Sequence, residues 1–167
     1  MITYISGGER SGKSRYAQDL ALERTAKPIY LATAKKWDEE FEERISRHQS
    51  DRDERWTTIE AQIELFDALP MDRVIVMDCV TLWLTNIFSH CKYERDPSFE
   101  LAQKEFQKLL DYQGHLIIIS NEIGMGLHAN SKSARNFVEL QGWTNQLIAR
   151  HADEAFFMVS GLALRLK

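Results

Sequence analysis

The stretch that decides the fold is Gly7-Gly8-Glu9-Arg10-Ser11-Gly12-Lys13-Ser14, which fits G-x-x-x-x-G-K-[ST] without exception. Residues 1–6 (MITYIS) before it are typical of a buried strand, and residues 13–25 after it are typical of a helix. In this context glycines let backbone N–H groups close around phosphate oxygens, and the positive end of the helix favours the anion. We expect Lys13 to contact the β- and γ-phosphates and Ser14 to offer its hydroxyl to Mg²⁺. The alternative, a glycine loop that only turns the chain, does not account for a complete motif between a strand and a helix.

Outward from this P-loop, short apolar runs alternate with longer amphipathic stretches. We expect further strands at residues 28–33, 56–59, 73–78, 115–120, 155–160 and 163–166. We expect helices at residues 38–48, 82–89, 98–112 and 133–149, with a break at Asp96-Pro97. The pattern predicts one domain, residues 1–167, with an α/β fold: a three-layer P-loop NTPase-type fold with a mostly parallel central sheet. Ligands bind beyond the carboxyl ends of such strands, so Gly7, Thr33, Asp78 and Asn121 should lie near one another.

Composition narrows the class of protein. The chain has 167 residues, 44% of them hydrophobic and 28% charged, which is typical of a globular protein. Its net charge of −4 argues against nucleic acid as a partner, because phosphate neutralisation needs a basic surface. The apolar runs are too short for a membrane span, and no signal peptide is expected. The two cysteines form no CxxC pair, which favours reduced thiols in a cytoplasmic protein.

Two further segments carry candidate chemistry. Asp78 ends an expected strand, where a carboxylate commonly holds Mg²⁺ directly or through water, although Asp also caps helices well. Arg44 and His48 are four residues apart, so on a helix they share a face that could grip phosphates, and a neutral imidazole could attack one. The alternative is a solvated helix on which acidic side chains pair with the arginines, and composition alone favours it.

The whole pattern resembles the bifunctional adenosylcobinamide kinase / adenosylcobinamide-phosphate guanylyltransferase family of cobalamin biosynthesis. The matching segments follow the family's order over nearly the whole chain. They are GGERSGKSRYA (7–17), YLATA (30–34), RISRHQSDR (44–52), WTTIE (56–60), DCVTLWLTN (78–86), NEIGMG (121–126) and GWTNQ (142–146). The chain departs from the family at Asp53, where Pro is usual, and at Leu127-His128-Ala129, where the usual Val-Pro is missing.

The resemblance implies two reactions: phosphorylation of adenosylcobinamide by ATP or GTP, then transfer of GMP from GTP to adenosylcobinamide phosphate. It implies that His48 carries the GMP, that residues 7–14 bind the triphosphate, and that the enzyme is a homotrimer. It also implies the remaining residues of the nucleotide site, which are Ala32, Thr33, Ala34, Gln49, Ser50, Asp51, Arg52, Glu60 and Asp78.

Three rival functions stay open at this point. A simple P-loop kinase would have no need of His48 as a nucleophile. A guanylyltransferase that has lost the kinase step would keep the same P-loop. A nucleotide sensor would bind GTP with Mg²⁺ and show neither turnover nor a covalent adduct.

Overall fold

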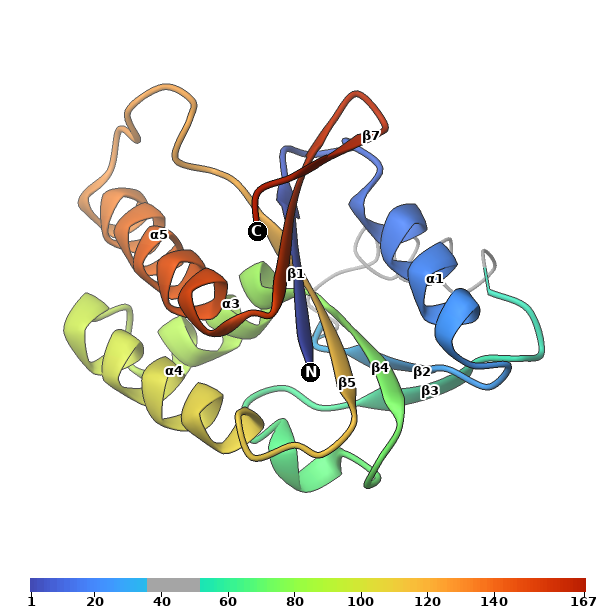
Figure 1. Cartoon of the computed structure of the whole chain (residues 1–167). Helices are drawn as coiled ribbons and strands as arrows, with labels where there is room; N and C mark the ends of the chain where they lie inside the picture. The colour runs from blue at the N-terminus through green and yellow to red at the C-terminus, as the bar shows by residue number, and fades with distance from the viewer. Residues whose placement is uncertain (36–51) are drawn as a thin grey trace.

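A computed structural model describes residues 1–35 and 52–167, and one seven-stranded sheet organises them. The strand order is β3-β2-β4-β5-β1-β6-β7 (Figure 1). Every pair of neighbouring strands is parallel except β6 and β7, which form an antiparallel hairpin. The bounds are β1 (Ile2–Gly7), β2 (Ile29–Ala32), β3 (Thr57–Glu60), β4 (Val74–Asp78), β5 (His115–Asn121), β6 (Glu154–Val159) and β7 (Leu162–Arg165).

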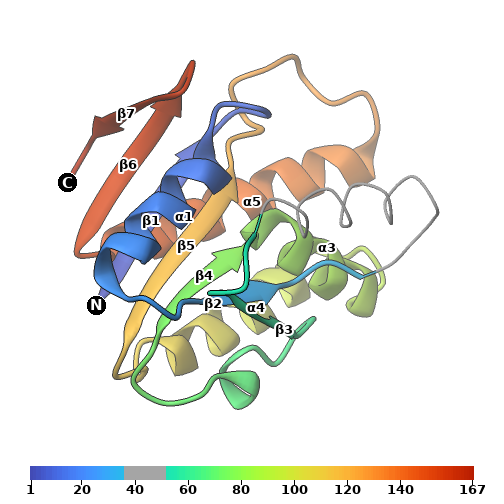
Figure 2. The same cartoon turned by 90° about the vertical axis from the view of Figure 1, so that its right-hand side faces the viewer.

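Helices cover both faces of this sheet (Figures 1 and 2). The first face is covered by α1 (Lys13–Arg24), which packs on β1, β4 and β5. On the other face lie α3 (Val80–His90) and α5 (Lys132–His151), and α4 (Arg95–Leu109) packs against both of them. A short 3-10 helix, η1 (Phe66–Ala68), precedes β4. The predicted three-layer α/β arrangement is therefore confirmed.

Two hydrophobic cores explain why the strands read as continuous apolar runs. Alternate residues of a strand point to opposite faces of the sheet. In β4, Ile75 and Met77 join the core under α3, α4 and α5, whereas Val76 joins the core under α1. In β5, Ile118 joins the core under α3, α4 and α5, and Ile119 joins the core under α1. Both faces of these strands must therefore be apolar, as in other buried parallel sheets.

One predicted boundary was wrong. The pair Asp96-Pro97 was expected to precede the helix, but α4 begins at Arg95 and contains both residues in its first turn. Proline is tolerated there, since a first-turn N–H has no acceptor within the helix. The 3-10 helix was not predicted. The expected helix at residues 38–48 lies outside the described residues.

The carboxyl ends of the parallel strands meet at one edge, which confirms the expected neighbourhood. Gly7 pairs with Asn121 across β1 and β5, and Ala32 pairs with Asp78 across β2 and β4. The backbone N–H of Thr33 donates to the carbonyl of Asp78 at 3.3 Å. A candidate site can therefore draw on the ends of several strands at once.

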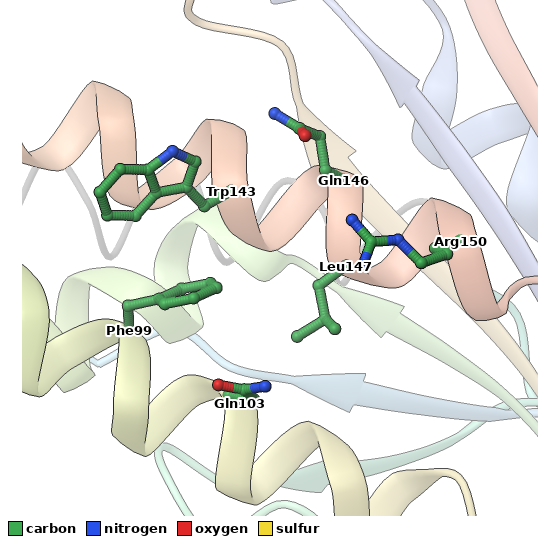
Figure 3. Close-up of a pocket in the computed structure, with 6 residues that line it drawn as sticks. All are labelled: Phe99, Gln103, Trp143, Gln146, Leu147 and Arg150. Carbon is green, nitrogen blue, oxygen red and sulfur yellow. The ribbon is translucent and has the colours of Figure 1, made fainter.

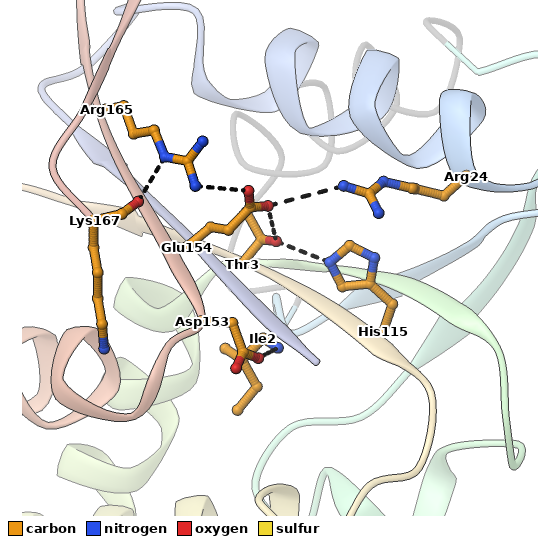
Figure 4. Close-up of polar contacts among 8 residues, drawn as sticks. All are labelled: Ile2, Thr3, Arg24, His115, Asp153, Glu154, Arg165 and Lys167. Atoms are coloured by element: carbon orange, nitrogen blue, oxygen red, sulfur yellow. Dashed lines mark hydrogen bonds and ion pairs between the residues drawn. The ribbon is translucent and has the colours of Figure 1, made fainter.

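A polar cluster lies at the opposite edge, where the strands begin (Figure 4). The hydroxyl of Thr3 lies 2.8 Å from Nε2 of His115 and donates to Glu154 at 3.4 Å. Burial lowers the pKa of His115, and the nearby guanidinium of Arg24 and the N-terminal amine act in the same direction. This edge therefore holds a histidine that the fold keeps neutral.

None of the helices in the described ranges is long and apolar enough to cross a membrane.

Candidate active site

The P-loop joins the end of β1 to the start of α1, and its backbone requires glycine at two positions. Gly7 has φ 155° and Gly12 has φ 97°, which L side chains rarely adopt. A Cβ on Gly7 would also lie 2.7 Å from the carbonyl oxygen of Met158. From the turn between β6 and β7, the N–H of Gly161 donates to the carbonyl of Ser11 at 3.0 Å. The loop is thus braced by the neighbouring hairpin, and it keeps the shape that its sequence predicts.

Lys13 lies inside this loop. The residue is 7% exposed, and its ammonium donates to the carbonyl of Gly8 at 2.6 Å. A buried ammonium at the N-terminal end of α1 creates a strongly positive environment for an anion. Loop, helix end and cation together therefore fit a polyphosphate.

Asp78 lies next to the P-loop although 64 residues separate it from Ser14. Its Oδ2 accepts hydrogen bonds from the hydroxyl of Ser14 at 2.9 Å and from the hydroxyl of Tyr30 at 2.8 Å. The next helix is capped by Cys79 without a side-chain hydrogen bond, so the capping alternative for Asp78 does not hold. A hydroxyl and a carboxylate are oxygen ligands of the kind that Mg²⁺ prefers. The two predicted metal ligands are therefore adjacent, and they fit the ion.

Thr33 uses its side chain to fasten the end of β2 to the start of α3. Its hydroxyl accepts from the N–H of Cys79 at 2.9 Å and donates to the carbonyl of the same residue at 2.8 Å. The residue is fully buried. In this arrangement its side chain holds the backbone in place.

Asn86 secures the same region and was missed by sequence reasoning. This buried residue of α3 donates from Nδ2 to the carbonyl of Thr33 at 2.8 Å and to that of Gln62 at 3.1 Å. Gln62 follows Glu60, the last residue of β3, which pairs with Ala32. One amide therefore connects two segments of the predicted nucleotide site.

Of the segment at residues 44–52, which was predicted to contribute to the nucleotide site, only Arg52 lies within the described residues. Arg52 stacks its guanidinium on the ring of Tyr30, 3.6 Å from the ring centroid. The predicted nucleophile His48 and the predicted nucleotide-site residues Gln49, Ser50 and Asp51 lie outside the described residues.

The comparisons with known proteins agree with this geometry. The sequence pattern of the family described as "Cobinamide kinase / cobinamide phosphate guanyltransferase" matches residues 3–166. The chain belongs to this family. It is 37% identical to the "Bifunctional adenosylcobalamin biosynthesis protein CobP" of Pseudomonas aeruginosa, over all of this chain and 98% of that protein. It is 32% identical to the "Bifunctional adenosylcobalamin biosynthesis protein CobU" of Escherichia coli K12, over the whole of both chains.

Membership of the cobinamide kinase / cobinamide phosphate guanyltransferase family makes the chain a nucleotide-binding transferase. The fold is also found outside the family. A structure described as a "prototypical ATPase from the type III secretion system of pathogenic bacteria" aligns with a TM-score of 0.55. The match covers 98% of this chain and 56% of that chain at 11% identity, so it supports the P-loop fold alone.

A separate open pocket lies between α4 and α5 (Figure 3). None of the residues predicted for the nucleotide or metal site lines this pocket. Its walls are formed by Phe99, Gln103, Trp143, Gln146, Leu147 and Arg150. The candidate active site is therefore the P-loop edge of the sheet.

Proposed function

We propose that this enzyme phosphorylates adenosylcobinamide with a nucleoside triphosphate and then converts the product to adenosylcobinamide-GDP with GTP. The proposal rests on the family to which the chain belongs and on one observation above all. That observation is the contact of the Ser14 hydroxyl with the Asp78 carboxylate, directly beside the buried ammonium of Lys13. A hydroxyl, a carboxylate and a lysine in this arrangement support the proposal of a site for a triphosphate and its Mg²⁺.

In the kinase step, the aminopropanol hydroxyl of adenosylcobinamide attacks the γ-phosphorus of the triphosphate. A P–O bond forms, the bond to the β-phosphate oxygen breaks, and the nucleoside diphosphate leaves while the hydroxyl proton passes to solvent. The P-loop N–H groups and Lys13 hold the phosphates in line and stabilise their charge. Mg²⁺, held by Ser14 and Asp78, supplies further neutralisation of the phosphate oxygens when bound.

In the transfer step, an imidazole nitrogen of His48 attacks the α-phosphorus of GTP and pyrophosphate leaves. A phosphate oxygen of adenosylcobinamide phosphate then attacks the same phosphorus, which breaks the P–N bond and restores His48. The covalent intermediate divides one difficult transfer into two displacements. The assignment of His48 comes from the family pattern, with Arg52 and Glu60 as partners of the nucleotide.

Intact-protein mass after incubation with GTP and Mg²⁺ tests the covalent step. We expect a gain of one GMP that is acid-labile and base-stable, absent in His48→Ala and retained in His90→Ala, which removes an exposed histidine of α3. No adduct on the native chain despite GTP binding would favour a simple kinase or a sensor. An adduct that survives in His48→Ala would keep the reaction but exclude this nucleophile.

The family resemblance also supports a place in the cytoplasm and a homotrimer as part of the proposal. Light scattering coupled to size-exclusion chromatography tests the oligomeric state. A monomer at micromolar concentration would contradict the proposed homotrimer.

A further inference from the structure

Tyr30 occupies an unusual position for a core aromatic residue. It lies in β2 with 5% of its surface exposed, and its ring belongs to the core under α1. Its hydroxyl reaches across to β4 and donates to Oδ2 of Asp78 at 2.8 Å. The same oxygen accepts the hydrogen bond of Ser14. A buried phenol therefore contacts the carboxylate that the proposed function assigns to the metal.

The hydrogen bond from Tyr30 constrains how Asp78 can meet a cation. A carboxylate oxygen can only accept, so the hydroxyl of Tyr30 is the donor in this hydrogen bond. Within the described residues, both side-chain hydrogen bonds to this carboxylate go to Oδ2. The second oxygen, Oδ1, is thereby kept available for Mg²⁺ or one of its water ligands.

The ring of Tyr30 holds a second group. Arg52 stacks on its face at 3.6 Å, and Trp56 packs edge-on at 6.3 Å between ring centroids. The Nη1 atom of Arg52 is buried and has no hydrogen-bond partner among the described residues. A buried guanidinium nitrogen without a partner is costly unless an anion pairs with it. The ring beneath this guanidinium carries the hydroxyl that contacts Asp78, at the edge of the sheet that holds the P-loop. We therefore take that anion to be a phosphate oxygen of the nucleotide.

We propose that Tyr30 is a positioning residue with two roles. Its hydroxyl fixes Asp78 for the metal of the metal–nucleotide complex, and its ring holds the guanidinium of Arg52 toward the phosphates. The proposal rests on the proposed function, because it takes the metal–nucleotide complex as the ligand. A purely structural Tyr30 would contribute packing to the core under α1 and nothing to metal affinity.

Tyr30→Phe separates these two possibilities, because it removes the hydroxyl and keeps the ring. The measurement is Mn²⁺ binding by electron paramagnetic resonance, with the protein saturated by an α,β-methylene analogue of GTP that cannot transfer GMP. We expect Mn²⁺ affinity to fall about tenfold, in line with the loss of one hydrogen bond to a charged group. Affinity for the analogue in EDTA should stay unchanged.

Tyr112→Phe is the matched control. Its hydroxyl donates to the carbonyl of Pro70 at 2.8 Å and accepts from the N–H of Arg73, at the start of β4 and far along the strand from Asp78. This variant should lose thermal stability and bind Mn²⁺ as the native protein does. Equal Mn²⁺ affinity in native protein and Tyr30→Phe would overturn the role of the hydroxyl.

Tyr30→Leu tests the role of the ring. We expect weaker binding of the analogue in EDTA, to the same degree as in Arg52→Gln, with no further loss when the two changes are combined. Additive losses would overturn the link between Tyr30 and Arg52. A native protein that binds the Mn²⁺ complex but forms no GMP adduct would leave this inference standing and contradict the proposed function. Failure to bind the complex at all would overturn both.

Discussion

Replacing Asn86 with alanine should loosen the active-site edge of the sheet. The side chain is 6% exposed, and its amide donates to the carbonyls of Thr33 and Gln62. Those two carbonyls belong to loops that follow β2 and β3. Without the amide, both loops lose the buried group that holds them against α3.

The cost follows from these contacts. Two neutral hydrogen bonds contribute about 2 kcal/mol together, and the buried carbonyl of Thr33 left without this donor adds about 1 kcal/mol. A destabilisation of about 3 kcal/mol corresponds to a decrease in Tm of roughly 6–12 °C for a chain of this size. The Oδ1 of Asn86, which has no hydrogen-bond partner among the residues described, is lost at the same time, and this limits the cost to the lower part of this range.

Thermal unfolding followed by circular dichroism measures this cost. Thr85→Ala is the control on the same helix, because the one hydrogen bond of its hydroxyl within residues 1–35 and 52–167 goes to the carbonyl of Thr81 in α3. Asn86→Leu keeps the branched shape of the side chain while removing the donor, and it should be destabilised to a similar extent. A Tm for Asn86→Ala within about 1 °C of the control would refute the reasoning, since such a small change is far below the value of two hydrogen bonds.

Three further predictions concern separate parts of the fold. Lys13→Ala should weaken GTP binding about 100-fold in calorimetry, because one buried charge-assisted contact to phosphate is lost, whereas Lys104→Ala on α4 should not change it. Burial lowers the pKa of His115, so the unfolded chain binds a proton more readily and stability should decline as the pH falls below about 6.5. His115→Gln should flatten this decline when Tm is measured from pH 8 to pH 5. An equal slope of Tm against pH in both proteins would contradict this role of His115. Ser131 caps α5 by accepting from Ala134 at 3.1 Å, so Ser131→Ala should cost about 1 kcal/mol in urea denaturation; an equal loss in Ser133→Ala, which lies just inside the helix, would argue against a capping effect.

Local sequence determined the P-loop and most of the elements around it. The motif at residues 7–14 fixes its own backbone, because Gly7 and Gly12 adopt φ values that other residues avoid and Lys13 starts the helix. Continuous apolar runs such as residues 115–120 identified buried parallel strands without any knowledge of their neighbours. The error at Asp96-Pro97 has a local cause too, since the same pair suits a helix start as well as a break.

Family membership also followed from the sequence, because it depends on the order of short segments along the chain and not on their contacts. The nearness of Gly7, Thr33, Asp78 and Asn121 was predictable as well. Parallel strands end at a common edge, so residues that close such strands lie along that edge, and the adjacent order β2-β4-β5-β1 makes these four neighbours.

Only the tertiary structure decided which side chains support the site. Tyr30 and Asp78 are 48 residues apart, and Asn86 and Thr33 are 53 apart, so no local pattern marks either pair. Their contacts exist because β2 lies beside β4 and α3 packs against the loops that follow β2 and β3. Periodicity tells which face of a strand is buried, but a single hydrogen bond depends on strand order and register together. That is why the groups proposed to bind the nucleotide could be named from the sequence, whereas the groups that hold them in place emerged from the fold.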